Sequence, residues 1–291
     1  MKVLVTGAKG QLGSDVMDEL AKRQHEAVGV DVQEMDITDK EIVGKTIFSV
    51  APDAVIHCAA WTAVDAAEEQ ENVELVRSIN SKGTANIAEA CKRLGCKMMY
   101  ISTDYVFNGK GEKPWQPDCK EYEPLSVYGK TKLEGELEVV KNVKEHFIVR
   151  IAWVFGKKGK NFIKTMLSLS DKYETLRVVN DQIGTPTYTL DLSRLLVDMI
   201  ETEKYGYYHA TNEGGYISWA EFASEIFKQS GKATKVIPVT TAEYGLSKAV
   251  RPFNSRLDKD KLVEKGFTPL PAWKDALKRY LKELGELNGE I

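Results

Sequence analysis

A glycine-rich segment near the amino terminus constrains the fold more than any other part of the sequence. Gly7, Gly10 and Gly13 recur at every third position, between the apolar run 2–6 and an amphipathic helical pattern over 12–24. Such glycines allow a tight turn and let a pyrophosphate approach the backbone amides and the positive end of the helix dipole. The segment therefore predicts a dinucleotide-binding βαβ unit, with a tight turn that binds no ligand as the alternative.

Apolar runs and amphipathic runs continue to alternate through the first half of the chain. The apolar runs cover residues 2–6, 27–31, 54–57, 97–102 and 147–151, and helical patterns follow at 12–24, 83–94 and 126–140. Parallel strands that are buried on both faces lose their polar alternation, because helices cover both sides of the sheet. The predicted fold class is therefore α/β, a doubly wound parallel sheet (Rossmann) with a smaller C-terminal substrate-binding region.

The rhythm changes after Arg150, where loops rich in glycine and proline appear. We assign residues 1–152 to the dinucleotide-binding Rossmann domain and 153–291 mainly to a substrate-binding region, with a later segment, roughly 176–210, returning to the first domain. No linker rich in Pro, Gly and Ser separates the two parts. They are therefore expected to share an interface.

Composition excludes several classes of function. The chain has 40 Lys and Arg against 43 Asp and Glu, a formal net charge of -3, which does not favour binding of nucleic acid. No apolar run approaches the roughly 20 residues of a membrane span, so we expect no membrane partner and a cytoplasmic location. The four cysteines form no Cys-x-x-Cys pair and no His-Glu-x-x-His motif occurs, so unpaired thiols and no metal site are expected.

The end of the second apolar run bears on the choice of cofactor. Asp31 follows Gly13 by eighteen residues, where a carboxylate can accept hydrogen bonds from the adenosine ribose. This position favours NADH over NADPH, although Lys9 or Arg23 could attract a 2′-phosphate. Asp36 and Ile37 are candidates for the adenine region. The residues expected beside the cofactor in this part of the chain are Gly7, Gly10, Gln11, Leu12, Gly13, Asp31, Asp36 and Ile37.

Tyr128, Lys132 and Thr103 form a candidate catalytic set. Tyr128 and Lys132 are four residues apart in a helical pattern, so their side chains share one face, and Thr103 ends an apolar run. A nearby ammonium favours a phenolate and lowers the pKa of tyrosine from about 10. The set predicts proton transfer to or from an oxygen whose carbon exchanges hydride with nicotinamide. A surface Tyr and Lys on a helix is the alternative.

Longer motifs carry a resemblance to a known family. They are TGAKGQLG (6–13), HCAAWTAVDAAE (57–68), ISTDYVF (101–107), YGKTK (128–132), RIAWVFG (150–156), NFIKTM (161–166), NDQIGTPT (180–187) and RPFNSRLD (251–258). With these motifs the chain resembles the extended short-chain dehydrogenase/reductase superfamily and, within it, the dTDP-4-dehydrorhamnose reductase family. The resemblance spans nearly the whole chain.

The resemblance implies NADH- or NADPH-dependent reduction of the 4-keto group of dTDP-4-dehydro-6-deoxy-L-mannose to dTDP-L-rhamnose. It makes Tyr128 the general acid, Lys132 the residue that lowers its pKa and holds the nicotinamide ribose, and Thr103 a hydrogen-bond partner of the keto oxygen. It also implies cofactor contacts from Ala59, Ala60 and Thr62, and substrate contacts from Val64, Thr103, Asp104, Tyr105, Trp153, Asn161, Arg251 and Ser255. Trp153 could equally be a core aromatic residue, and Arg251 could form an ion pair with Asp258 or Asp260.

Related activities remain as alternatives. Tyr105 stands where 4,6-dehydratases of the superfamily carry a Glu base, which removes that mechanism, whereas a nucleotide-sugar 4-epimerase or a non-catalytic regulatory subunit of the same fold stays open. Some family members dimerise through a divalent metal, and Asp15 stands here where a Glu is expected. Mg²⁺ at a dimer interface is therefore in doubt, and monomer and homodimer are both open. The acidic run of Asp65, Glu68, Glu69 and Glu71 is interpreted as a solvated helix face.

Overall fold

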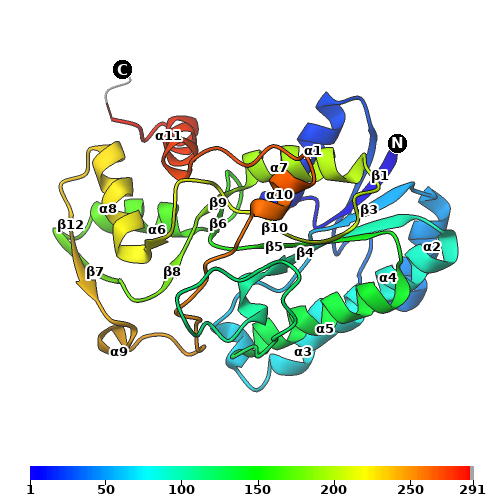
Figure 1. Cartoon of the computed structure of the whole chain (residues 1–291), viewed down its shortest axis with the longest axis horizontal. Helices are drawn as coiled ribbons and strands as arrows, with labels where there is room; N and C mark the ends of the chain where they lie inside the picture. The colour runs from blue at the N-terminus through cyan, green and yellow to red at the C-terminus, as the bar shows by residue number, and fades with distance from the viewer. Residues whose placement is uncertain (289–291) are drawn as a thin grey trace.

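A parallel sheet of six strands forms the centre of the computed structural model, which describes residues 1–288 (Figure 1). The strand order is β10-β5-β4-β3-β1-β2, and every neighbouring pair is parallel. The strands are β1 (Lys2–Thr6), β2 (Glu26–Val30), β3 (Ala54–His57), β4 (Lys97–Thr103), β5 (His146–Ile151) and β10 (Gly206–His209). The predicted doubly wound fold class is confirmed.

Alternation along β1 shows how both faces of the sheet become buried. Val3 and Val5 belong to one apolar core, and Leu4 between them belongs to the other. The first core is covered by α1 (Gln11–Lys22) and α7 (Thr189–Ile200), and the second by α2 (Lys40–Val50), α4 (Thr84–Leu94) and α5 (Val127–Asn142). Helices on both faces exclude water from the sheet. The ends of its strands are not covered in this way, so polar residues there can form a site.

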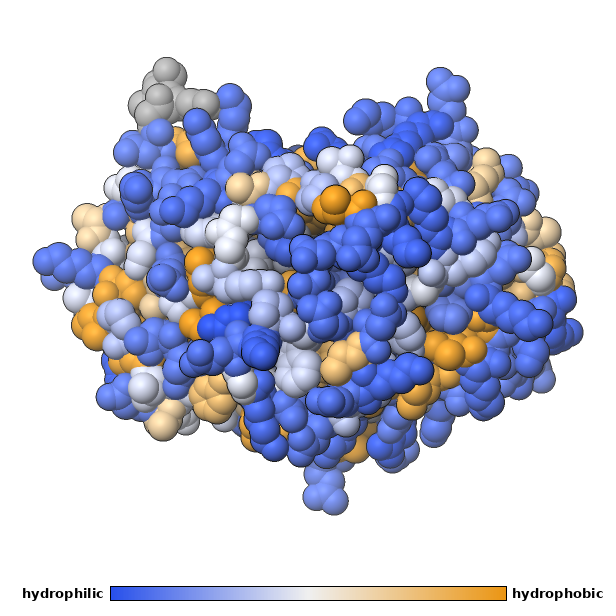
Figure 2. All heavy atoms as spheres, viewed as in Figure 1, coloured by the Kyte–Doolittle hydropathy of each residue, from blue (hydrophilic) through white to orange (hydrophobic). Residues whose placement is uncertain are grey.

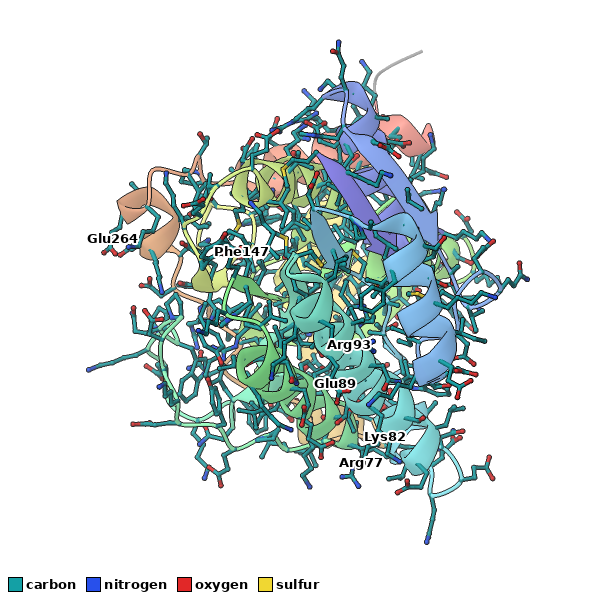
Figure 3. The ribbon with its side chains drawn as sticks, turned by 90° about the vertical axis from the view of Figure 1, so that its right-hand side faces the viewer. Arg77, Lys82, Glu89, Arg93, Phe147 and Glu264 are labelled. Atoms are coloured by element: carbon teal, nitrogen blue, oxygen red, sulfur yellow. The ribbon has the colours of Figure 1, made fainter. Side chains whose placement is uncertain are left out.

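The helical layer beside α5 contains a π-type turn between two α-helices. α3 (Val73–Arg77) passes through the π-type segment η2 (Ser78–Gly83) into α4, and Arg77, Lys82, Glu89 and Arg93 lie along the outside of this stretch (Figure 3). Glu89 forms an ion pair with Lys40 at 2.6 Å, and the Arg93 guanidinium lies 4.8 Å from the centre of the Phe48 ring. These exposed contacts lie at the edge of the apolar core that α2 and α4 share.

The second half of the chain builds a smaller part beside the sheet, on the left in Figure 1. It contains α6 (Phe162–Ser170), α8 (Trp219–Ser230), α9 (Thr241–Tyr244) and α11 (Trp273–Leu284), with the short strands β6 (Val154–Phe155), β7 (Thr175–Val179), β8 (Ile183–Gly184), β9 (Thr187–Tyr188), β11 (Ile217–Ser218) and β12 (Lys235–Val239). The short helix α10 (Asp260–Glu264) lies instead against β10, and its Leu262 belongs to the first core of the sheet. Aromatic and aliphatic side chains of α6, α8 and α11 share one core.

The segment that was expected to return to the first domain is divided between the two parts. α7 packs on α1, and β10 pairs with β5 at the edge of the sheet. β7 instead pairs with β12, and its Val178 lies in the core of the smaller part. An apolar β-branched run does not by itself reveal which of two sheets it joins, so the sequence placed the start of this return too early.

The surface is mainly hydrophilic on the face seen in Figure 2, and apolar residues gather there in separate small patches. Within residues 1–288, no helix has the length and apolar character needed to cross a membrane.

A buried ion pair fixes α5 on the sheet. Arg150 on β5 and Glu136 on α5 both have fully buried side chains, with Nε–Oε1 and Nη2–Oε2 distances of 2.8 and 2.7 Å. The guanidinium also donates to the carbonyl of Pro117 and the hydroxyl of Tyr122. Two parallel hydrogen bonds between planar groups define the orientation of both side chains.

We expect Glu136→Gln to lower the free energy of unfolding by about 3–5 kcal/mol, because a buried guanidinium then lacks its counter-charge. Urea denaturation measures this loss. The control is Glu138→Gln on the same helix, where the partner Lys141 is exposed and Glu138 is partly exposed, so a change below about 1 kcal/mol is expected. Equal effects of the two substitutions would contradict this role of the buried pair.

Candidate active site

A cavity of about 1030 Å³ lies at the carboxyl ends of the parallel strands. Thr6, Val30, Thr103 and Ile151, the last residues of β1, β2, β4 and β5, all line it. Ligands of open α/β sheets bind at this edge, because loops and helix amino termini meet there. The predicted residues that line the cavity are Gly7, Gly10, Gln11, Leu12, Gly13, Asp31, Asp36, Ile37, Ala59, Ala60, Thr62, Val64, Thr103, Asp104, Tyr105, Tyr128, Lys132, Trp153 and Arg251.

The glycine loop packs too closely at the start of α1 to admit side chains at Gly7 and Gly13. Gly7 has φ +65, and a Cβ there would lie 2.8 Å from the Ala59 nitrogen, while a Cβ on Gly13 would lie 2.1 Å from the Gly7 carbonyl oxygen. Gly10 caps α1 without a side-chain hydrogen bond. Amides of the first helical turn have no partner within the helix, so they face an anion readily. The loop therefore fits a dinucleotide.

The far end of this part of the cavity is acidic. Asp31 accepts a hydrogen bond from the Lys9 amide at 3.1 Å, and the Lys9 ammonium pairs with Glu34 at 2.7 Å. Arg23, the other candidate partner of a 2′-phosphate, is tied to Glu19 and Asp198 instead and does not line the cavity. A carboxylate therefore lines the cavity just after β2, and Lys9 is the nearby cation.

Thr103, Tyr128 and Lys132 all line the cavity. α5 begins at Val127, so Tyr128 stands on its first turn and Lys132 one turn later, and the Thr103 hydroxyl is a hydrogen-bond partner of Tyr128. Burial raises the pKa of Tyr128 well above its ordinary value, and the carboxyl of Asp104 adds to this rise. Tyr128 is thus protonated near neutral pH.

The ammonium of Lys132 has the Ile101 carbonyl and the Tyr100 ring as its neighbours. It donates to the Ile101 carbonyl at 2.7 Å and lies 4.0 Å from the centre of the Tyr100 ring. Burial lowers the pKa of Lys132 to about 7, against an opposing effect of Glu136. Lys132 is not among the groups that shift the pKa of Tyr128 here, so its effect on that pKa stays a prediction, because helical spacing brings two side chains to one face without directing their polar ends at each other.

Asp104 is a buried carboxyl behind the catalytic set. Its Oδ1 accepts from the Thr103 hydroxyl at 3.0 Å, and burial raises its pKa to about 6, against opposing effects of Ser255 and Thr103. Ser255 itself does not line the cavity and is almost fully buried. The structure thus places Ser255 behind Asp104, where it supports the carboxyl.

Aromatic side chains form the opposite wall. Trp153 stacks on Trp219 with ring centroids 3.7 Å apart, and Phe162 and Phe222 lie beside them at the cavity. Trp153 has φ +51, a strained conformation for a large side chain that costs on the order of 1–3 kcal/mol. Trp153 both packs against the core of the smaller part and faces the cavity. The sequence analysis did not predict Trp219. The available signal was that Trp219 and Phe222 stand three residues apart, directly after the helix-capping residue Ser218.

Two predicted substrate contacts have other partners. Asn161 caps α6 and donates to Gln11, the Gly156 carbonyl and Tyr280, so its amide is fully engaged away from the cavity. Arg251 lines the cavity, but its ion pair is with Asp65, at 2.6 Å, and not with Asp258 or Asp260.

The residues that the structure describes offer no ligand set for a metal at Asp15. The Asp15 carboxyl is hydrogen-bonded to Thr189, and burial raises its pKa, with smaller contributions from Glu283 and Asp18. Among residues 1–288, no three His, Cys, Asp or Glu side chains come together as a metal site.

Comparisons with known proteins match the whole architecture. Residues 1–286 match the model of the RmlD substrate binding domain family. The spore coat polysaccharide biosynthesis protein SpsK of Bacillus subtilis is 40% identical over 282 residues, which are 97% of each chain.

Two solved structures are similar in fold and sequence. The crystal structure of a dTDP-4-dehydrorhamnose reductase from Clostridium acetobutylicum is 42% identical, with a TM-score of 0.94 over 98% of this chain and 100% of that one. The enzyme of the same name from Bacillus anthracis, in complex with NADP, is 39% identical, with a TM-score of 0.92 over 97% and 100%. With a family model over nearly its full length and relatives at about 40% identity, the chain belongs to the RmlD substrate binding domain family.

Proposed function

We propose that this chain reduces the 4-keto group of dTDP-4-dehydro-6-deoxy-L-mannose, with NADH or NADPH, to give dTDP-L-rhamnose. The observation that carries the proposal is that one cavity is lined by the glycine loop, by Thr103, Tyr128 and Lys132, and by Arg251 together with aromatic side chains. Relatives of about 40% identity over the full length that are named dTDP-4-dehydrorhamnose reductase support the reaction.

The chain's own residues supply binding and proton transfer. When bound, the reduced nicotinamide supplies the hydride. Tyr128, held protonated by burial, donates its proton to the keto oxygen, and Thr103 provides a second polar contact at that oxygen. Lys132 lies on the same helix face and can reach the ribose of the cofactor as an ammonium. Arg251 offers two parallel donors to a diphosphate.

The direct test is the loss of NADH or NADPH absorbance with enzymatically generated dTDP-4-dehydro-6-deoxy-L-mannose, with and without Mg²⁺. Tyr128→Phe should lower kcat by about 10²–10⁴-fold, because the proton donor is lost, while cofactor binding stays unchanged. Tyr173→Phe, at a largely exposed tyrosine outside the cavity, is the matched control and should retain wild-type kcat.

The same assay separates the alternatives. A wild-type rate in Tyr128→Phe would remove the assigned acid. Isomerised substrate without net oxidation of cofactor would indicate an epimerase, and bound cofactor without any turnover would favour a regulatory subunit.

For the cofactor, we propose that Asp31 makes NADH the favoured form. Asp31→Ala should weaken NADH binding about tenfold, since the ribose loses a charged hydrogen-bond partner, and should leave NADPH unchanged or tighter, since repulsion of the 2′-phosphate disappears. Fluorescence titration gives both dissociation constants. Asp171→Ala, which removes only a surface pair with Lys232, is the control. Equal losses for both cofactors would contradict this role of Asp31.

The pH dependence should follow Lys132. Because burial lowers its pKa to about 7, the ammonium is present below that pH and is lost as the pH rises through it. The kcat/KM of the free enzyme should therefore fall as the pH rises through about 7. Lys132→Arg should give a lower rate without this decline, since a guanidinium stays protonated. Asp104 also titrates near this pH, and Asp104→Asn tests its contribution. If the decline in kcat/KM disappears in Asp104→Asn, the decline belongs to Asp104.

A further inference from the structure

We propose that Asp65 and Glu68 are positioning residues of the active site: Asp65 holds Arg251 at the substrate end of the cavity, and Glu68 fixes the turn of α5 that carries Tyr128. This inference rests on the proposed function. Asp65 precedes the 3₁₀ turn η1 (Ala66–Glu68) and Glu68 is its last residue, in the acidic run that was expected to be a solvated helix face. Both carboxylates instead bind other segments of the chain.

Asp65 gathers four donors from one distant loop. Its Oδ1 accepts from the amides of Lys248 and Ala249, each at 3.0 Å, and from Arg251 Nη1 at 3.1 Å. Its Oδ2 accepts from Arg251 Nη2 at 2.6 Å. The guanidinium holds the pKa of Asp65 below its ordinary value, so the carboxylate remains ionised near neutral pH. The Asp65 carboxylate thus binds both the backbone amides of this loop and its Arg251 guanidinium.

The anchor places Arg251 at the cavity. Arg251 lines the cavity together with Val64, and its guanidinium also interacts with the Tyr105 hydroxyl. The segment after α9 carries Arg251 from the smaller part of the molecule (Figure 1). Nearby, the Lys248 ammonium pairs with Glu69 at 2.8 Å. Without Asp65 the guanidinium keeps only its contact with Tyr105 and becomes free to leave the position that suits a diphosphate.

Glu68 acts on the catalytic helix. Its Oε1 accepts from the amide of Val127, the first residue of α5, at 2.7 Å. That amide has no partner within the helix, and the capping hydroxyl of Ser126 satisfies the amide of Gly129 instead. Tyr128 is the next residue. Glu68 therefore fixes the backbone that orients the phenol, from outside the reacting atoms.

The two carboxylates should affect different kinetic steps. A 3₁₀ helix has about three residues per turn, so Asp65 and Glu68 project from the same side of η1. One reaches the loop that holds the substrate, and the other reaches the helix that holds the acid. Loss of Asp65 is thus a loss of substrate affinity, and loss of Glu68 is a misplacement of the proton donor.

The test of Asp65 measures binding and turnover separately. Asp65→Asn, which keeps an acceptor for the backbone amides but removes the charge, should raise the dissociation constant of thymidine diphosphate and the KM of the sugar nucleotide about tenfold. It should leave kcat within about twofold, and NADPH binding unchanged. Calorimetric titration with thymidine diphosphate does not depend on catalysis, so it also tests Asp65 if the wild-type enzyme fails to turn over the proposed sugar.

The test of Glu68 uses a conservative rescue. Glu68→Ala should lower kcat about tenfold and leave the affinity for thymidine diphosphate unchanged, whereas Glu68→Gln, which retains an amide oxygen for Val127, should restore most of kcat. Asp118→Asn is the control, because Asp118 forms a similar two-contact ion pair, with Lys261, outside the cavity.

Three outcomes overturn the proposal. Unchanged thymidine diphosphate binding in Asp65→Asn would remove the role of Asp65, and unchanged kcat in Glu68→Ala would remove that of Glu68. Parallel losses of kcat, affinity and thermal stability in both variants, unlike Asp118→Asn, would show a purely structural role. A wild-type chain that binds thymidine diphosphate but does not oxidise cofactor would instead count against the proposed function alone.

Discussion

The buried pair of Arg150 and Glu136 is the interaction on which the geometry of the active site depends. Glu136 follows Lys132 by one turn of α5 and Tyr128 by about two. Its bidentate contact with Arg150 fixes the rotation of α5 over β4 and β5. Removing two charges from water is costly, and a packed apolar pair would often be as stable. We therefore interpret the pair as a device that orients the helix rather than one that adds stability.

Burial has opposite effects on the titratable groups around the reacting position. It raises the pKa of Tyr128 and that of Asp104, and it lowers the pKa of Lys132 to about 7. All three shifts favour the uncharged form, because the environment solvates charge poorly. A site of this kind keeps tyrosine as an acid at neutral pH. The polar strand end of β4 then supplies the remaining hydrogen bonds, through Thr103.

Local features of the site could be predicted from the sequence, and long-range pairings could not. The glycine loop, the strand end at Thr103 and the four-residue spacing from Tyr128 to Lys132 all follow from short segments whose geometry is set by their own backbone. The partner of Arg251 lies 186 positions away, at Asp65, and no local pattern distinguishes it from Asp258. Asn161 was misassigned because a helix cap and a ligand contact require the same side chain.

The division of the site between the two halves of the chain has a consequence for specificity. The glycine loop, Asp31 and the catalytic residues stand on the sheet and its helices, whereas Trp153, Trp219 and Arg251 come from the later, more irregular part. Rigid elements can keep one hydride chemistry constant, while loops that contact the substrate can change without unfolding the sheet. Asp65 is the exception, because it lies on the first half and binds the loop of residues 248–251 in the second. Substitutions in that loop are therefore constrained by its contacts with Asp65. Asp65 directly precedes the turn η1, whose last residue, Glu68, binds the first residue of α5.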